Sequence, residues 1–167
     1  MAKHKRSDGH AISQSKPSKN HCFACGNDNR YGMKLKFYRD EEARRTICQF
    51  KLSRRYEGPP GYAHGGVIAT ILDEAMGKVN KFRNVVALTK KMEVEYLKPV
   101  PLYTKLTVIG REHEVVGRRH INVAEISNDS GQVLARSTGT FIAIDTSQVL
   151  ALLSKSSDRP RSLNKNL

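Results

Sequence analysis

The residues of this 167-residue chain that could do chemistry lie at the start of one helical segment. His64, Gly65 and Gly66 open the segment, and Asp73 follows nine residues after the histidine. The first amides of a helix have no intrahelical acceptor, and the helix dipole makes this end partially positive. A developing oxyanion at Gly65 or Gly66 would be stabilised by these donors, and glycine lets a substrate approach them closely. Asp73, about two turns further along, could reach a carbonyl or a water beside it.

The helix predicted over residues 64–82 has one wide apolar face, and Asp73 lies just outside that face. Its neighbours on the helical wheel include Gly66, Ala69 and Gly77, which leave room beside the carboxylate. The pattern by itself also fits a helix entry in which His64 packs or caps, with a solvated aspartate further on. The apolar face consists of Val67, Ile68, Ile71, Leu72, Ala75, Met76 and Val79.

Strand patterns surround this helix on both sides. Residues 33–38 alternate apolar and polar side chains, and after a charged turn at 39–42 a second alternating run ends near Leu52. These two runs predict a hairpin. Connections of hairpin length require an antiparallel sheet, so we expect an α+β fold in which the sheet wraps around the helix. Four longer β-branched runs follow the helix, at 85–97, 105–116, 118–127 and 132–144.

The net charge of +13 favours anionic partners. Part of this charge belongs to the two ends, which predict a disordered basic tail over 1–20 and a basic C-terminal tail over 147–167, around one domain at 21–146. Nucleic acid is not the expected partner. The sequence shows no Cys/His finger or recognition-helix pattern, and its aromatic content is only 7% without any Trp.

The chain has no apolar run of membrane-spanning length and no secretory h-region, so we expect no membrane partner. Three cysteines, an odd number, fit a reducing cytoplasm. Cys22 and Cys25, next to His21, invite a zinc hypothesis. Structural zinc usually has four ligands, and the remaining Cys48 belongs to a strand face that we expect to be buried. The sequence therefore predicts no metal.

Four separated blocks, in the right order over residues 20–145, resemble hotdog-fold thioesterases of the phenylacetic-acid-pathway (PaaI-like) branch. Residues 62–77 resemble the family's central helix, with His-Gly-Gly and an Asp nine residues after the His. Residues 87–101 and 131–141 are similar to the family's next strand and its last strand. The lead-in Cys22-Phe23-Ala24-Cys25-Gly26 is similar to one that is common in this branch.

This resemblance implies a homodimer, often paired into a tetramer, that hydrolyses acyl-CoA thioesters at the subunit interface, with coenzyme A as part of the substrate and no separate cofactor. It implies that the acyl carbonyl sits at the Gly65 and Gly66 amides and that Asp73 acts as general base or nucleophile. Thr89 from the partner's strand would orient the water or the carboxylate. Some relatives place a polar residue six positions before the His, whereas this sequence has Gly58 there.

Four basic residues are candidates for holding the phosphates of coenzyme A, although a solvated strand face would explain each of them equally well. His113 and His120 flank the turn near 117, and we expect both on the surface. Two other functions stay open: a non-catalytic acyl-CoA-binding regulator, and a hotdog dehydratase or hydratase. The candidate phosphate ligands are Lys90, Lys91, Arg118 and Arg119.

Overall fold

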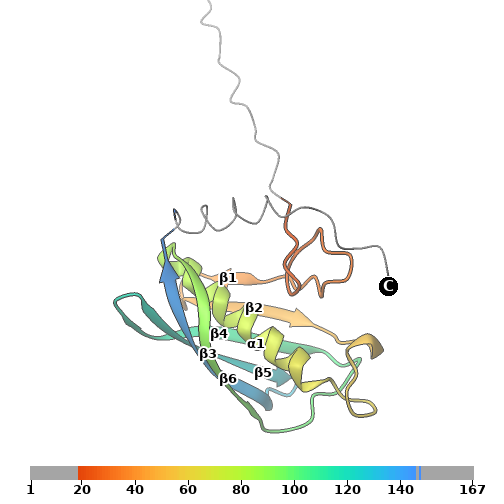
Figure 1. Ribbon diagram of the computed structural model, residues 1–167. Helices are drawn as coiled ribbons and strands as arrows, with labels where there is room; N and C mark the ends of the chain where they lie inside the picture. The colour runs from red at the N-terminus through yellow and green to blue at the C-terminus, as the bar shows by residue number, and fades with distance from the viewer. Residues whose placement is uncertain (1–18, 146, 148–167) are drawn as a thin grey trace, which may run out of the picture.

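The computed structural model describes residues 19–145 and residue 147. Six antiparallel strands form one sheet in the order β1-β2-β4-β5-β6-β3, and one long helix lies against it (Figure 1). This arrangement confirms the predicted α+β hotdog fold. In chain order the elements are β1 (Tyr38–Asp40), β2 (Arg45–Phe50), the 3-10 turn η1 (Arg54–Tyr56), α1 (Gly65–Val79), the 3-10 turn η2 (Asn80–Arg83), β3 (Val86–Tyr96), β4 (Leu106–Val116), β5 (Arg119–Asn128) and β6 (Val133–Ile144).

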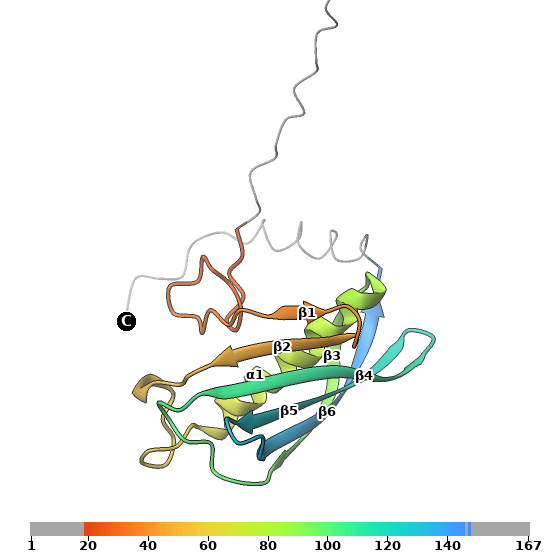
Figure 2. The ribbon, with the colours of Figure 1, turned by 180° about the vertical axis from the view of Figure 1, so that it is seen from behind.

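The sheet curves around α1, which crosses one face of β4, β5 and β6. Seen from behind, the strands cover the helix (Figure 2). Among the described residues β3 pairs only with β6, so it forms one edge of the sheet, and the short β1 forms the other. The helix therefore has the sheet on one side and an open flank along β3.

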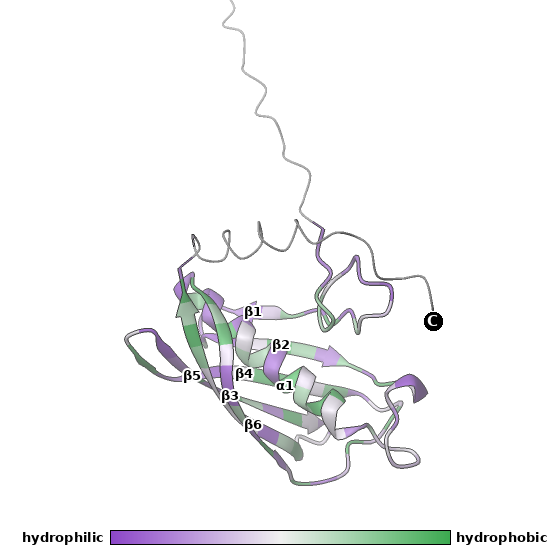
Figure 3. Cartoon of the chain, in the orientation of Figure 1, coloured by the Kyte–Doolittle hydropathy of each residue, from purple (hydrophilic) through white to green (hydrophobic). Residues whose placement is uncertain are grey.

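The core lies between α1 and the sheet, where the predicted apolar face of the helix is buried. Ile71, Leu72, Ala75 and Met76 have no exposed surface. Figure 3 shows hydrophobic and hydrophilic residues mixed along the strands. Burial alternates along β5, as expected when only one face of a sheet is covered. Facing the helix from the strands are Leu106, Val108, Ala124, Ile126 and Phe141.

Two glycines let the helix approach the sheet closely. A Cβ at Gly110 of β4 would lie 2.5 Å from the Ala75 carbonyl oxygen of α1. A Cβ at Gly139 of β6 would lie 2.9 Å from the Met76 Cε. The Gly110 contact is with the backbone of the helix, so α1 could not lie this close to β4 if Gly110 had a side chain, whereas the contact at Gly139 leaves room for the Met76 side chain.

Two details differ from the sequence predictions. The segment before Tyr38 buries Leu35, as the alternation predicts, but forms no ladder with the sheet. Its amides bond instead to the lead-in, as Leu35 does to the Ala24 carbonyl (2.9 Å). The hairpin of β1 and β2 is therefore real but begins five residues later than predicted, at Tyr38 rather than residue 33.

The prediction that His120 lies on the surface is wrong, because only 3% of this residue is exposed. Alternation along β5 turns His120 and Asn122 toward the helix. The side-chain amide of Asn122 donates to the Met76 carbonyl (2.9 Å), so β5 supplies a hydrogen-bond donor to one of the last carbonyl groups of α1. His113 is exposed, as predicted.

The two predicted tails fall almost wholly outside the described residues. Asn20 belongs to the folded lead-in, because its amide donates to Asp28 (2.7 Å). Within the described part of the chain, no helix has both the length and the apolar content needed to cross a membrane.

Candidate active site

His64 is the N-cap of α1. Its backbone is extended (φ −64°, ψ 138°), and its Nδ1 accepts a hydrogen bond from the Gly66 amide at 3.0 Å. This bond satisfies one of the amides that a helix start otherwise leaves open. The expectation that Gly66 supplies an open oxyanion donor is therefore wrong for this structure, and His64 has a structural role instead.

The Gly65 amide remains open, since it donates no hydrogen bond to any residue in 19–145 or 147. It borders an apolar hollow of about 570 Å³ that includes Ile68 and Leu97, which we name the Gly65 hollow. Tyr96 of β3 also lines this hollow, and its hydroxyl donates to the Gly65 carbonyl (3.1 Å). Tyr96 is a site residue that sequence reasoning missed, because nothing in its spacing shows that β3 reaches the helix start.

Asp73 and Thr89 meet across the gap between α1 and β3. The Thr89 hydroxyl donates to Asp73 Oδ1 at 2.8 Å. Among the described residues no other side chain bonds to this half-buried carboxylate, so Oδ2 is free to act. The two residues line a hollow of about 310 Å³, here named the Asp73 hollow, together with Gly77 and Phe141.

A β-bulge aims Thr89 at the helix. In the pairing of β3 with β6, Thr89 lies opposite Phe141 and Lys91 lies opposite Thr140, so Lys90 is an extra residue. Bulges bend a strand locally and redirect side chains, and they are frequent next to active sites. The bulge explains how a residue on an edge strand can face Asp73.

Thr89 reaches Asp73 of its own chain, which corrects the expectation that it acts from the partner subunit. The structure brings together Asp73 and Thr89 as one group and His64, Gly65 and Gly66 as another. Asp73 lies eight positions after Gly65 along α1, which corresponds to about 12 Å along the helix axis. The two groups are therefore two separate parts of a site.

Gly58 has a packing reason to be glycine. A Cβ at this position would lie 2.8 Å from the His64 Cα. A polar side chain such as the one some relatives carry here would displace the segment that leads into α1. In this chain the attacking group must be oriented by other residues.

The four candidate phosphate ligands do not line the Asp73 hollow. Lys91 pairs with Glu93 on the exposed side of β3 (2.6 Å). Arg118 donates to the Ala143 carbonyl (3.0 Å), and Arg119 is exposed at the start of β5. Since His120 faces the helix, alternation turns Arg119 to the opposite face of the sheet. The basic residues that do line the Asp73 hollow are Lys78 and Lys81, which sequence reasoning missed.

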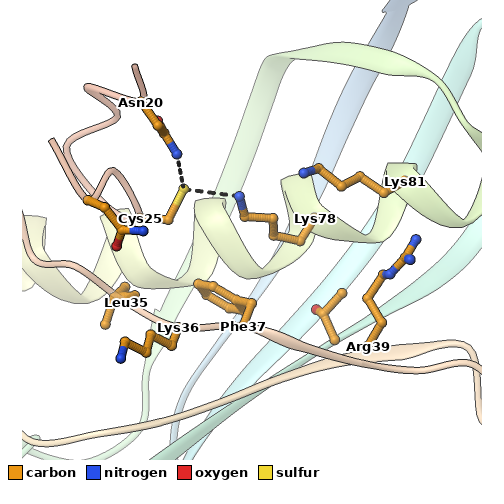
Figure 4. A pocket seen from close by; sticks show the side chains of 10 residues that line it. Asn20, Cys25, Leu35, Lys36, Phe37, Arg39, Lys78 and Lys81 are labelled. Carbon is orange, nitrogen blue, oxygen red and sulfur yellow. Dashed lines mark hydrogen bonds between the residues drawn. The ribbon is translucent and has the colours of Figure 1, made fainter. Parts of the chain in front are cut away.

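Cys22 and Cys25 lie beside α1, where Glu74 joins them. One ligand-type atom from each of these three residues lies within 4.8 Å of the others. The Lys78 ammonium contacts both Cys25 Sγ (3.0 Å) and Glu74 Oε1 (2.9 Å), and Figure 4 shows it directed at the thiol. The ammonium group of Lys78 on α1 thus already supplies positive charge to this cluster.

The pKa values of this cluster reflect burial and mutual contact. Burial raises the pKa of the Cys25 thiol, and the neighbouring Glu74 acts in the same direction. Burial alone would raise the pKa of Glu74, but hydrogen bonds from Cys25 and Lys78 hold it below its usual value. Glu74 is therefore an ionised anchor between α1 and the lead-in. Burial also raises the pKa of Cys48, a fully buried core residue, to about 11.

Sequence comparison finds several similar proteins. A sequence model of the thioesterase superfamily matches residues 60–135. The acyl-coenzyme A thioesterase THEM4 of Xenopus laevis is 31% identical over 109 residues, which cover 65% of this chain and 49% of that protein. THEM4 of Rattus norvegicus is 28% identical over 120 residues, covering 71% of this chain and 52% of that protein. The chain spans about half the length of these curated relatives.

Solved structures show the same architecture. A thioesterase superfamily protein superimposes with a TM-score of 0.71 and 26% identity, covering 80% of this chain and 70% of that one. A Streptococcus mutans protein bound to acetyl-CoA gives a TM-score of 0.63 at 23% identity, covering 71% of this chain and 94% of that one, and this likeness concerns the fold alone. Residues 60–135 thus resemble the thioesterase superfamily, and the fold of the described chain is the hotdog fold of a solved thioesterase superfamily protein.

Proposed function

We propose that the protein hydrolyses acyl-CoA thioesters to a free acid and coenzyme A, with Asp73 as the reacting carboxylate. The observation that carries this proposal is the hydrogen bond from Thr89 to Asp73 Oδ1, which fixes the carboxylate at the Asp73 hollow and leaves Oδ2 free. The sequence relatives named acyl-coenzyme A thioesterases support the substrate class. An enzyme gains from such preorganisation because the carboxylate needs no reorientation during the reaction.

The Gly65 amide is the proposed oxyanion donor. Attack on the thioester carbonyl places negative charge on its oxygen, and a fixed N–H directed at that oxygen stabilises the transition state. The positive end of the α1 dipole acts in the same direction. The Gly65 hollow is mostly apolar around this amide, and an apolar surrounding strengthens such an interaction once a substrate fills it.

A single chain cannot apply both groups to one carbonyl. The oxyanion must lie about 3 Å from its donor, and the attacking oxygen must start about 3–3.5 Å from the carbonyl carbon. With about 12 Å along the helix between Gly65 and Asp73, these requirements cannot be met together. We infer that a second copy of the chain brings its own Gly65 to the Asp73 of the first.

The exposed edge of the sheet is suited to such a homodimer. The β3 strand has no partner on its outer side within the described residues, and it exposes Val86, Leu88 and Tyr96 by about half. Unpaired strand edges with apolar side chains favour association. Pairing two copies along β3 would place both parts of the site at the interface.

Two mechanisms remain compatible with this geometry. In the first, Asp73 Oδ2 attacks the carbonyl carbon, the thiolate of coenzyme A leaves, and water then hydrolyses the resulting anhydride. In the second, Oδ2 takes a proton from water, whose oxygen attacks directly. A single turnover in water labelled with heavy oxygen separates them. Label found in Asp73 after one turnover would show the covalent mechanism, with water attacking the aspartyl carbon of the anhydride, whereas the direct mechanism labels only the acid.

The test of the proposed function is the release of free thiol from a panel of short, medium, long and aromatic acyl-CoA esters. We expect Asp73→Asn to lower kcat by about 10²–10⁴-fold, since it removes the reacting charge but keeps the acceptor for Thr89. An unchanged melting temperature would show that the fold is intact. Absence of thiol release by the wild type across the panel would reject the proposal, and tight binding without turnover would establish the regulator instead.

A further inference from the structure

A second hollow, of about 510 Å³, lies between the lead-in, β1 and the C-terminal end of the helix (Figure 4). We name it the basic hollow, because Lys36, Arg39, Lys78 and Lys81 line it and no Asp or Glu of the described chain does. Lys78 and Lys81 extend from the helical side, Arg39 rises toward them from β1, and Lys36 points aside. The volume is in the range of small-molecule sites in proteins.

The cations of the basic hollow are only partly compensated. Lys78 pairs with Glu74 (2.9 Å), and Arg39 pairs with the exposed Glu41 (3.2 Å). Neither Lys36 nor Lys81 has a carboxylate within 4.0 Å among residues 19–145 and 147. A hollow with an excess of positive charge attracts anions, and phosphate groups suit both lysine and arginine.

The basic hollow adjoins the site of the proposed reaction. Lys78 and Lys81 line it on one side and the Asp73 hollow on the other. Lys81 follows Asp73 by eight residues, which corresponds to about 12 Å along the helical direction. The extended pantetheine arm of coenzyme A is long enough to bridge this separation between thioester and phosphates.

From these contacts we infer that the basic hollow binds the phosphate groups of the thiol carrier, with Lys81 and Arg39 as the principal ligands. This inference rests on the proposed thioester hydrolysis and assigns the anionic end of the substrate to residues other than Lys90, Lys91, Arg118 and Arg119. The same phosphate chemistry could come from the nucleotide of coenzyme A or from the single phosphate of a phosphopantetheine group.

The test compares one acyl group carried by coenzyme A, by phosphopantetheine and by pantetheine without phosphate. We expect Lys81→Ala and Arg39→Ala each to raise KM for the CoA ester roughly 3–10-fold more than KM for the pantetheine ester. Lys81→Arg should restore most of the difference. Higher salt should weaken the advantage of the CoA ester, because exposed ion pairs are screened.

The three carriers also distinguish the two sources of phosphate. If the nucleotide occupies the basic hollow, the phosphopantetheine ester behaves like the pantetheine ester; if a single phosphate suffices, it behaves like the CoA ester. Lys105→Ala is the matched control, since Lys105 is exposed and pairs with the remote Asp129 (3.2 Å). The inference would be overturned if the ratio of KM for the CoA ester to KM for the pantetheine ester were the same in Lys81→Ala, Arg39→Ala and wild type. It would also be overturned if Lys90→Ala or Arg119→Ala, instead of these two, changed that ratio.

Failure of the proposed function gives a different result. If no ester is hydrolysed, calorimetric titration with coenzyme A alone still tests the basic hollow, by comparing wild type with Lys81→Ala and Lys105→Ala. A dissociation constant that is 3–10-fold larger in Lys81→Ala, and unchanged in Lys105→Ala, would support the inference. Equal affinities of all three proteins, or no binding to the wild type, would reject it.

Discussion

The hydroxyl of Thr89 donates a hydrogen bond to Oδ1 of Asp73 across the gap between β3 and α1. The bond depends on the bulge at Lys90, which turns Thr89 toward the helix, and on Gly110, which lets the helix lie close to the sheet. The orientation of the carboxylate is therefore determined jointly by an edge strand and by the packing of α1 on the central strands.

Removing the Thr89 hydroxyl should lower activity without unfolding the protein. Thr89→Val leaves Asp73 without its donor, and a hydrogen bond to a charged group contributes about 1.5–3 kcal/mol. We expect kcat to fall roughly 10–100-fold, and Thr89→Ser to stay within about 3-fold of wild type. Steady-state hydrolysis of one acyl-CoA ester measures both variants. Equal turnover by the Val and Ser variants would show that the hydroxyl does not position Asp73.

The role of the Gly65 amide can be tested by removing only its hydrogen. Proline is favoured at the first position of a helix, and the extended His64 (ψ 138°) has the conformation that precedes proline. Gly65→Pro should therefore fold but lose about 10²–10³-fold in kcat. Gly65→Ala is the control, because it retains the N–H and its Cβ would lie 3.5 Å from the Tyr96 hydroxyl, an ordinary contact. Full activity of Gly65→Pro would exclude this amide as the oxyanion donor.

Most of the fold could be predicted from the sequence because its patterns are local. The apolar stripe of α1 and the alternation along the strands follow from periodicity alone, and both appear in the structure. The position of Asp73 outside the stripe was predictable for the same reason. Residues 33–37 look like a strand because their side chains alternate, but their amides bond to the lead-in, and sequence does not show which backbone is the partner.

The contacts between elements could not be predicted in this way. Thr89 reaches Asp73 of its own chain only because of a one-residue bulge, and no residue type marks that bulge in the sequence. The capping of Gly66 by His64 depends on the extended entry of the chain into α1. The cluster of Glu74 with Cys22 and Cys25 could not be predicted either, because Cys22 and Glu74 lie 52 positions apart in the sequence.

Acid should reveal the contribution of Glu74 to stability. Hydrogen bonds from Cys25 and Lys78 outweigh burial and hold its pKa below the usual 4.5. A carboxyl group whose pKa is lowered by folding stabilises the folded state above its unfolded pKa, and this contribution disappears as the pH falls through the folded pKa. Glu74→Gln should thus lower the melting temperature by about 3–6 °C at pH 7 and progressively less below about pH 4.5.

The control for Glu74→Gln is a variant of a carboxylate that forms an ion pair on the exposed surface. Glu93→Gln is suitable, since Glu93 is 70% exposed and its partner Lys91 is 68% exposed. Exposed ion pairs contribute little, so its melting curve should follow that of the wild type at every pH. A Glu74→Gln variant that is equally destabilised at pH 7 and pH 3 would show that the loss comes from packing and not from charge.

Mixing two inactive variants should restore activity if each site combines two chains. In a dimer of one Asp73→Asn chain and one Gly65→Pro chain, the first chain supplies an intact Gly65 and the second an intact Asp73. One of the two sites is then complete and the other carries both changes. With random exchange about half of the dimers are mixed, so an equimolar mixture should recover roughly a quarter of the wild-type activity per chain, since each mixed dimer has one working site.

The variants should be unfolded and refolded together, with each refolded alone as the control. If Gly65 and Asp73 acted within one chain, every site in the mixture would carry one defect and no activity would return, so the recovered fraction distinguishes the two arrangements directly.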